Sequence, residues 1–102
     1  MSSLELEAIN EQIGDFRPSE VDVIEIYDIQ MEKITEDVKK RLERYKNLMC
    51  LAFDGCGLKS LENFPNLPNL TILDLSDNKL TGESLKPLTG FKDLLILFLG
   101  GN

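Results

Sequence analysis

The sequence contains no histidine and only two cysteines among its 102 residues. A zinc site would therefore have to combine Cys50 and Cys56 with carboxylates, which is a poor ligand set for that metal. A single cysteine pair provides no disulfide framework and is normally reduced inside cells. We expect neither a structural metal nor a cofactor.

Long apolar runs are also missing from this chain. No stretch approaches the roughly 18 consecutive apolar residues that a membrane-spanning helix requires. Residues 1–13 carry no basic side chain, so they lack the positive region of a secretory signal peptide. These absences predict a soluble nuclear or cytoplasmic protein, and the length fits one domain over residues 1–102.

The formal net charge of −7 is distributed unevenly. Residues 1–37 hold eleven acidic and two basic side chains, whereas residues 38–46 hold five basic and one acidic. An acidic chain repels phosphate backbones at long range, so we expect no direct nucleic-acid binding. Proteins with basic surfaces are the expected partners.

One pattern recurs along the chain, with the form L-x-x-L-x-L-x-x-N/C-x-L. Close copies begin at Leu48, Leu70 and Leu94, and a weaker copy begins at Val21, so the copies are 27, 22 and 24 residues apart. The copy that begins at Leu94 stops at Asn102, its ninth position. The spacing predicts an α/β leucine-rich-repeat solenoid of about four parallel strands.

Each copy predicts a short strand whose alternate side chains point to opposite faces. The leucine positions, which are Leu51, Phe53, Leu73, Leu75, Leu97 and Leu99, are expected to point into a shared core. No single repeat can bury its apolar face alone, so each depends on its neighbours. At the ninth position, Cys56, Asn78 and Asn102 are expected to turn inward and to satisfy buried backbone groups.

The segments around the strands predict the rest of the solenoid. Residues 3–14 read as a helix that ends at Gly14 and caps the N-terminal end within residues 1–17. Thr35 is placed to cap a second helix, which buries Val38, Leu42 and Tyr45. A short 3₁₀ or irregular return is expected after the second strand, and a helical turn is expected over residues 82–90.

The chain resembles the N-terminal leucine-rich-repeat domain of the acidic leucine-rich nuclear phosphoprotein family. The likeness is carried by residues 17–21 (Arg-Pro-Ser-Glu-Val), by a long first repeat that contains a helix, and by residues 73–82 (Leu-Asp-Leu-Ser-Asp-Asn-Lys-Leu-Thr-Gly). The resemblance implies a nuclear regulator that binds histones and inhibits a type-2A protein phosphatase. In that family much of the histone binding belongs to a long acidic C-terminal tail.

Two alternatives stay open at this point. One is a protein that resembles the spliceosomal A-prime protein and holds an RNA-recognition domain. The other is a structural or regulatory repeat protein associated with a phosphatase or with dynein. All three interpretations describe binding proteins and predict no enzymatic activity.

The residues between the buried leucines should share the open, concave face of the sheet. They include three acids, an apolar column and exposed aromatic side chains of the kind that anchor interfaces, and two more acids, Asp28 and Asp77, lie just beyond the strands. Acids beside apolar area suit a partner with lysines and arginines. The predicted partner-binding residues are Glu25, Tyr27, Asp28, Asp54, Ile72, Asp74, Asp77, Ile96 and Phe98.

Two further readings concern single features of the sequence. Asp74 and Asp77 resemble a carboxylate pair, but no second catalytic group accompanies them and the repeat already explains their positions. The last strand would present an uncapped edge, so we expect either a longer parent protein or self-association through that edge.

Overall fold

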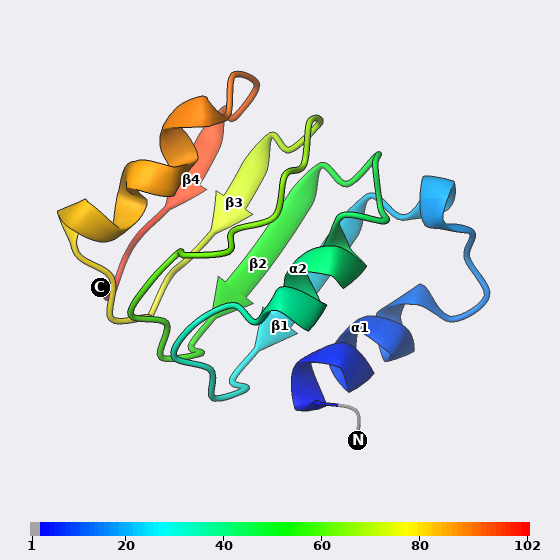
Figure 1. Cartoon of the computed structure of the whole chain (residues 1–102), viewed down its shortest axis with the longest axis horizontal. Helices are drawn as coiled ribbons and strands as arrows, with labels where there is room; N and C mark the ends of the chain where they lie inside the picture. Colours follow the sequence, from blue (N-terminus) through cyan, green and yellow to red (C-terminus); the bar gives the residue numbers. More distant parts are fainter. Residues whose placement is uncertain (1–2) are drawn as a thin grey trace.

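Each copy of the repeated pattern contributes one β-strand. The computed structural model describes residues 3–102 and contains β1 (Val23–Tyr27), β2 (Cys50–Asp54), β3 (Ile72–Asp74) and β4 (Ile96–Phe98). The strands are parallel and follow the sequence order β1-β2-β3-β4 across one sheet (Figure 1). The fold is therefore mixed α/β with a four-stranded parallel sheet, as the spacing predicts.

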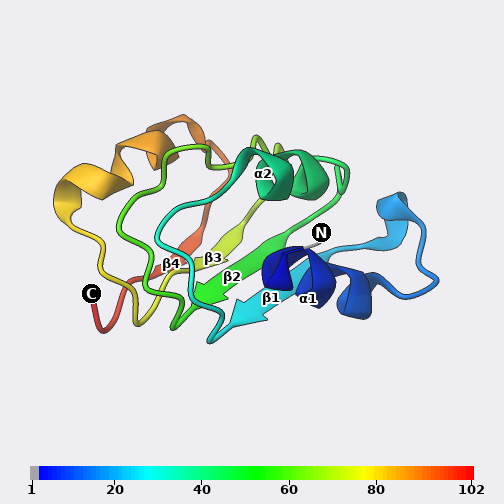
Figure 2. The ribbon, with the colours of Figure 1, turned by 60° about the horizontal axis from the view of Figure 1, so that its bottom comes forward.

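Three of the four helical segments in residues 3–102 lie where the sequence predicts them. The four are α1 (Leu4–Ile13), α2 (Glu36–Leu42) and two 3₁₀ segments, η1 (Pro18–Glu20) and η2 (Gly82–Gly90), and η1 was not predicted. The Ser3 side chain caps α1 and the Thr35 side chain caps α2, each by accepting a backbone N–H of the first turn. The segments that return from one strand to the next cover one face of the sheet, and α1 lies beside β1 (Figure 2).

The core lies between the sheet and its return segments. The predicted strand residues Leu51, Phe53, Leu73 and Leu75 are completely buried, as are Val38 and Leu42 from α2. Burying each side chain of this size stabilises the fold by about 2 kcal/mol. The alternation of buried and open positions is thus confirmed along β1 and β3, whereas in β2 the open position Ala52 is also buried.

The prediction of a buried core was wrong for one position of the last repeat. Leu97 is 37% exposed, and Leu99 is only partly buried. In residues 3–102, β4 pairs with β3 on one side alone, so no following repeat covers Leu97.

The ninth positions form the predicted ladder. Asn78 accepts hydrogen bonds from the backbone N–H groups of Cys56 and Leu58, both at 3.1 Å, and donates to the carbonyl of Phe53 at 2.6 Å. Asn102 repeats this arrangement one copy later by accepting from Leu80 at 3.1 Å. The Cys56 thiol donates to the carbonyl of Ile26 at 3.5 Å. These side chains satisfy backbone groups that would otherwise be buried without partners.

A glutamine covers the outer edge of β1, which the sequence did not predict. The Gln12 side chain donates to the carbonyl oxygen of Glu25 at 2.5 Å and accepts from the N–H of Glu25 at 2.7 Å. The side-chain amide thus takes the place of a neighbouring strand's peptide group. Because an unpaired strand edge promotes association, this contact protects the N-terminal side of the sheet.

Candidate partner-binding surface

The strand register brings the predicted binding residues onto one face. Val23, Cys50, Ile72 and Ile96 are partners across all four strands and form a single apolar row. Two residues further along, the next row contains Glu25, Ala52, Asp74 and Phe98, and Tyr27 is paired with Asp54 beyond it. This face lies opposite the return segments (Figure 2). We call it the open face.

Large side chains on the open face are accessible to a partner. Tyr27 is 49% exposed and Phe98 is 50% exposed, while Val23 and Ile96 are 44% and 43% exposed. Ile72 and Asp74, at the centre, are half-buried because strands flank them on both sides. Ala52 lies in the same row as Asp74 but is buried, so it offers little contact area.

The acids of the open face gather toward the ends of the strands. Asp28 directly follows β1, and Asp77, which lies shortly after β3, is its equivalent two repeats later; both adopt left-handed backbone conformations, with φ of 55° and 57°. The equivalent residues in the alternate repeats are Gly55 and Gly101. A Cβ atom at Gly55 would collide with the Asp28 carboxylate, and one at Gly101 would collide with the Asp77 carboxylate. Each carboxylate therefore lies over a glycine of the next repeat.

The neighbouring acids of this cluster affect the pKa of Asp54. Partial burial raises the pKa of Asp54, and the negative charges of Asp74, Asp77 and Asp28 raise this pKa further. Three carboxylates of the repeats on either side therefore act on Asp54. Holding like charges together is unfavourable unless a positive partner offsets the repulsion.

Cys50 lies beside the same acids and is not a candidate nucleophile. Burial raises the pKa of the Cys50 thiol, and the charges of Glu25, Asp74 and Asp22 raise it further. Burial also raises the pKa of Cys56, the ladder residue. Because the thiolate is the reactive form, both cysteines are shifted toward the unreactive thiol.

A second group of residues lies where the strands begin, and the sequence analysis did not predict it. Just before each strand, one carbonyl accepts hydrogen bonds from two successive N–H groups of the next repeat: Asp22 from Met49 and Cys50, Met49 from Thr71 and Ile72, and Thr71 from Leu95 and Ile96. This repeated geometry sets Met49, Thr71 and Leu95 side by side where the strands begin. Leu95 is 81% exposed.

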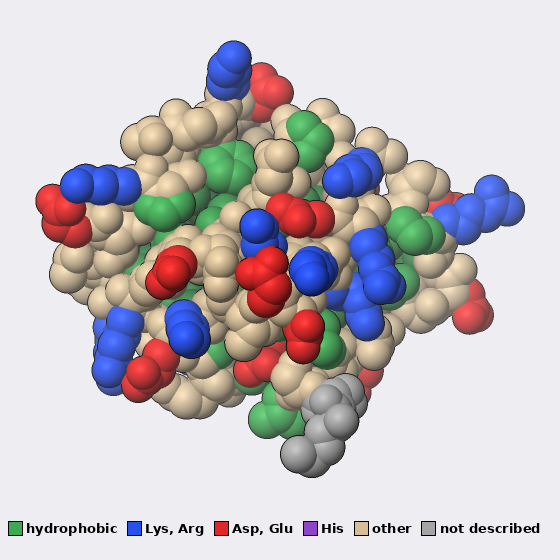
Figure 3. All heavy atoms as spheres, in the orientation of Figure 1, with side chains coloured by type: hydrophobic (Ala, Val, Ile, Leu, Met, Phe, Trp, Pro, Cys, Tyr) green, Lys and Arg blue, Asp and Glu red, His purple; other side chains and the backbone are tan. Residues whose placement is uncertain are grey.

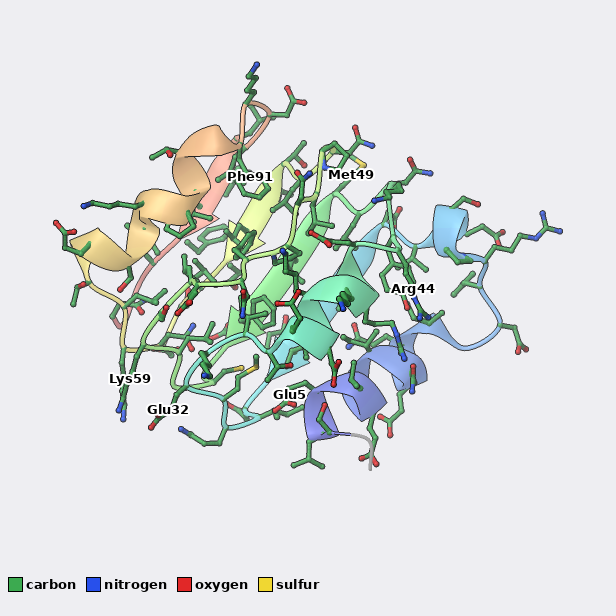
Figure 4. All side chains as sticks on the ribbon, in the orientation of Figure 1. Glu5, Glu32, Arg44, Met49, Lys59 and Phe91 are labelled. Atoms are coloured by element: carbon green, nitrogen blue, oxygen red, sulfur yellow. The ribbon has the colours of Figure 1, made fainter. Side chains whose placement is uncertain are left out.

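These strand-start residues line a hollow of about 570 Å³, together with Asn47, Asn69, Lys92 and Asp93. Met49 lies at the edge where the strands begin, whereas Glu32 and Lys59 lie at the edge where they end (Figure 4). The signal that could have found the hollow is the recurrence of large apolar side chains, Met49 and Leu95, one residue before the strands.

The face that the return segments cover carries charges of both signs, unlike the acidic open face. Lysines, arginines and acids are interspersed over α2 and the return segments (Figure 3). The ion pairs found within residues 3–102 are Lys59–Glu32, at 3.2 Å, and Lys86–Glu83, at 2.8 Å. Neither pair includes an acid of the open face. On that face, the Tyr27 hydroxyl donates a hydrogen bond to the Glu25 carboxylate.

Two other kinds of site are absent from the described part of the chain. Residues 3–102 contain no group of three or more Cys, Asp or Glu side chains placed to hold a metal ion. None of the helices described has the length and apolar character that crossing a membrane demands.

Comparison with known proteins identifies relatives of this chain. The chain is 43% identical over 97 residues to a Tetrahymena thermophila protein that is named as a histone, a match that covers 95% of this chain and 25% of that protein. It is 35% identical over 75 residues to an acidic leucine-rich nuclear phosphoprotein 32-related protein of Plasmodium falciparum, covering 72% of this chain and 27% of the relative.

A third relative, acidic leucine-rich nuclear phosphoprotein 32 family member A of Drosophila melanogaster, is 33% identical over 84 residues, covering 59% of this chain and 32% of that protein. The chain thus spans between a quarter and a third of the length of these three relatives. Several relatives carry the family name that the sequence motifs indicated. No family model matches the chain, and no solved structure matches it.

Proposed function

We propose that this chain is the leucine-rich-repeat module of a nuclear regulator of the acidic leucine-rich nuclear phosphoprotein 32 kind, and that its open face binds basic proteins. The parallel strands in sequence order and the asparagine ladder support a leucine-rich-repeat solenoid. The names of the relatives support the family and the nuclear location. We propose no enzymatic activity for the module.

The observation that carries the binding function is the unpaired charge of the open face. The charges of Asp74, Asp77 and Asp28 raise the pKa of Asp54, and no ion pair found in residues 3–102 neutralises these four acids. Lysines and arginines of a partner would remove this repulsion and gain charge-assisted hydrogen bonds. The exposed Tyr27 and Phe98 side chains add anchors beside the charges.

Histones are the partner class that we propose first. The Tetrahymena relative that is named as a histone contains a region similar to nearly this whole chain, which supports a role beside histones. Inhibition of a type-2A phosphatase, the arrangement resembling the spliceosomal A-prime protein, and a structural role beside a phosphatase or dynein stay predictions.

Binding to purified core histones tests this proposal by titration calorimetry. The double variant Asp54→Asn, Asp77→Asn should bind at least about tenfold more weakly than wild type, because two desolvated charge pairs are lost. The matched control is Glu62→Gln, Glu83→Gln, which removes two acids outside the open face and should change the affinity less than about twofold.

Two results would contradict the proposal. Absence of binding by the wild-type chain would remove histones as the partner class. Equal weakening by both double variants would assign the effect to net charge and not to the open face.

A further inference from the structure

The open face is divided into two parallel lanes with different chemistry. The apolar lane crosses all four strands through Val23, Cys50, Ile72 and Ile96. Where the strands begin, Met49 and Leu95 line a hollow of about 570 Å³ that is separate from this lane. The acidic lane runs parallel to the apolar lane near the strand ends and consists of Asp28, Asp54, Asp74 and Asp77.

The dimensions of the lanes follow from sheet geometry. Four strands about 4.8 Å apart make each lane about 14 Å long, and Cys50 and Asp54, four residues apart on β2, are separated by about 13 Å. Asp74 is two residues from Ile72, so it is the member of the acidic lane that lies nearest the apolar row, about 7 Å away. A ligand that uses both lanes must therefore be wide as well as long.

This width favours a helix over an extended peptide. An extended segment places alternate side chains on opposite sides, so those that face the sheet would fall on one line and contact one lane. An α-helix is about 10–12 Å across with its side chains and can present an apolar stripe to one lane and a charged flank to the other. A lane of about 14 Å corresponds to about nine or ten helical residues.

The acidic lane is held in place before any partner arrives. The backbone of Asp28 and Asp77 is left-handed, and their carboxylates occupy the space above Gly55 and Gly101. The Asp74 carboxylate accepts a hydrogen bond from the N–H of Ser76 at 3.0 Å. Side chains that are already ordered lose less conformational entropy on binding.

We propose that the open face binds a basic amphipathic α-helix that crosses the strands. Its apolar stripe lies over the apolar lane. Its lysines and arginines lie on the flank above the acidic lane. This inference rests on the proposed function and names the form in which the basic partner is recognised.

Three synthetic peptides of about 16 residues and identical composition test the form of the ligand. The first is a helix with leucines on one stripe and arginines on the adjacent flank. The second is a helix with the arginines opposite the leucines, and the third alternates leucine and arginine with the period of a strand. We expect the first peptide to bind at least about tenfold more tightly than the others, measured by fluorescence anisotropy. Equal affinity for all three peptides would overturn the proposal.

Variants of the chain test the lanes separately. Val23→Ser with Ile96→Ser removes exposed apolar area, and Asp54→Asn with Asp77→Asn removes charge from the acidic lane. Each pair of substitutions should lower the affinity for the first peptide at least about fivefold. Glu62→Gln, on the face that the return segments cover, should leave this affinity unchanged. Circular dichroism confirms that each variant is folded. If either lane can be altered without loss of affinity, the two-lane arrangement is wrong.

The histone titration separates this inference from the proposed function. One outcome is that core histones bind in a way that depends on the open face while the three peptides bind with equal affinity. This result would overturn only the proposal that the ligand is a helix. Failure of both the core histones and the first peptide to bind the wild-type chain would overturn both proposals.

Discussion

Leu73 and Asp74 are neighbours on β3, yet they belong to regions with different physical constraints. Leu73 is completely buried and faces the return segments, whereas Asp74 is half-buried on the open face. The buried positions must be apolar and well packed, because a cavity there costs the fold directly. The open positions tolerate acids that repel one another and exposed aromatic side chains. In one strand, the buried alternate side chains can therefore stabilise the fold while the open ones recognise a partner.

The largest expected effect tests the buried side of this comparison. Leu73→Ala should lower the free energy of unfolding by about 3 kcal/mol, because it leaves a cavity beneath the centre of the sheet. Ile72→Ala, on the same strand, should cost about 1 kcal/mol, since its side chain is only half-buried. Urea denaturation measures both. Equal losses would mean that the two faces do not differ in packing.

The next effect concerns the ladder that joins the repeats. Asn78→Ala should cost about 2 kcal/mol, because the N–H groups of Cys56 and Leu58 and the carbonyl of Phe53 lose their side-chain partner. Asn69→Ala is the control: it removes one exposed hydrogen bond, from Asn69 to the carbonyl of Lys46, and should cost less than about 0.5 kcal/mol. Thermal unfolding of the two variants should differ clearly; similar melting temperatures would contradict a role for the ladder.

The edge of β1 provides a smaller and more local effect. Gln12→Ala should cost about 1 kcal/mol and should speed hydrogen exchange at the Glu25 amide, whose acceptor is the Gln12 side chain. Glu11→Ala changes the neighbouring exposed residue of α1 and should leave that amide protected. If exchange at Glu25 is the same in both variants, Gln12 does not cover the edge.

The smallest expected effect is a gain in stability, unlike the losses above, and it comes from a residue of the open face. The folded-state pKa of Asp54 is raised above its ordinary value of 3.8, so ionisation of this group opposes folding. The stabilisation that protonated Asp54 contributes is complete at pH values below the ordinary pKa of the unfolded chain. It is lost as the pH rises through the raised pKa of the folded chain. Asp54→Asn should therefore stabilise the chain at neutral pH, by about 0.5 kcal/mol for a site this close to solvent.

The pH dependence of that gain provides its check. The advantage of Asp54→Asn should disappear below about pH 3.8, where the aspartate is protonated in both states. It should also shrink in high salt, which screens the neighbouring carboxylates. A neutral-pH gain that persists in acid would assign the effect to packing and not to charge.

Much of this architecture could be predicted from the repeated pattern. The copies at Val21, Leu48, Leu70 and Leu94 located every strand, and their alternation separated the core from the open face. The pattern was wrong for Leu97, because burial depends on whether a neighbour covers the position and not on the residue type alone. The binding role of the open-face residues stays a prediction.

Other features were missed because they depend on contacts between distant repeats. Asn10 and Gln12 occur in the sequence as ordinary polar residues of a helix, yet Asn10 bonds to Arg41 and Gln12 pairs with β1. The row formed by Met49, Thr71 and Leu95 depends on hydrogen bonds to carbonyls of the preceding repeats. Spacing within one repeat carries no information about such partners.

The sequence by itself determined the number of strands, their parallel order and which side chains face the core, because these follow from local periodicity and from the need to bury leucines. Only the tertiary structure decided that Asp28 lies over Gly55, that acids of neighbouring repeats raise the pKa of Asp54, and that Met49 and Leu95 line a hollow where the strands begin. Those outcomes depend on the register between strands, and register is set when the repeats pack together.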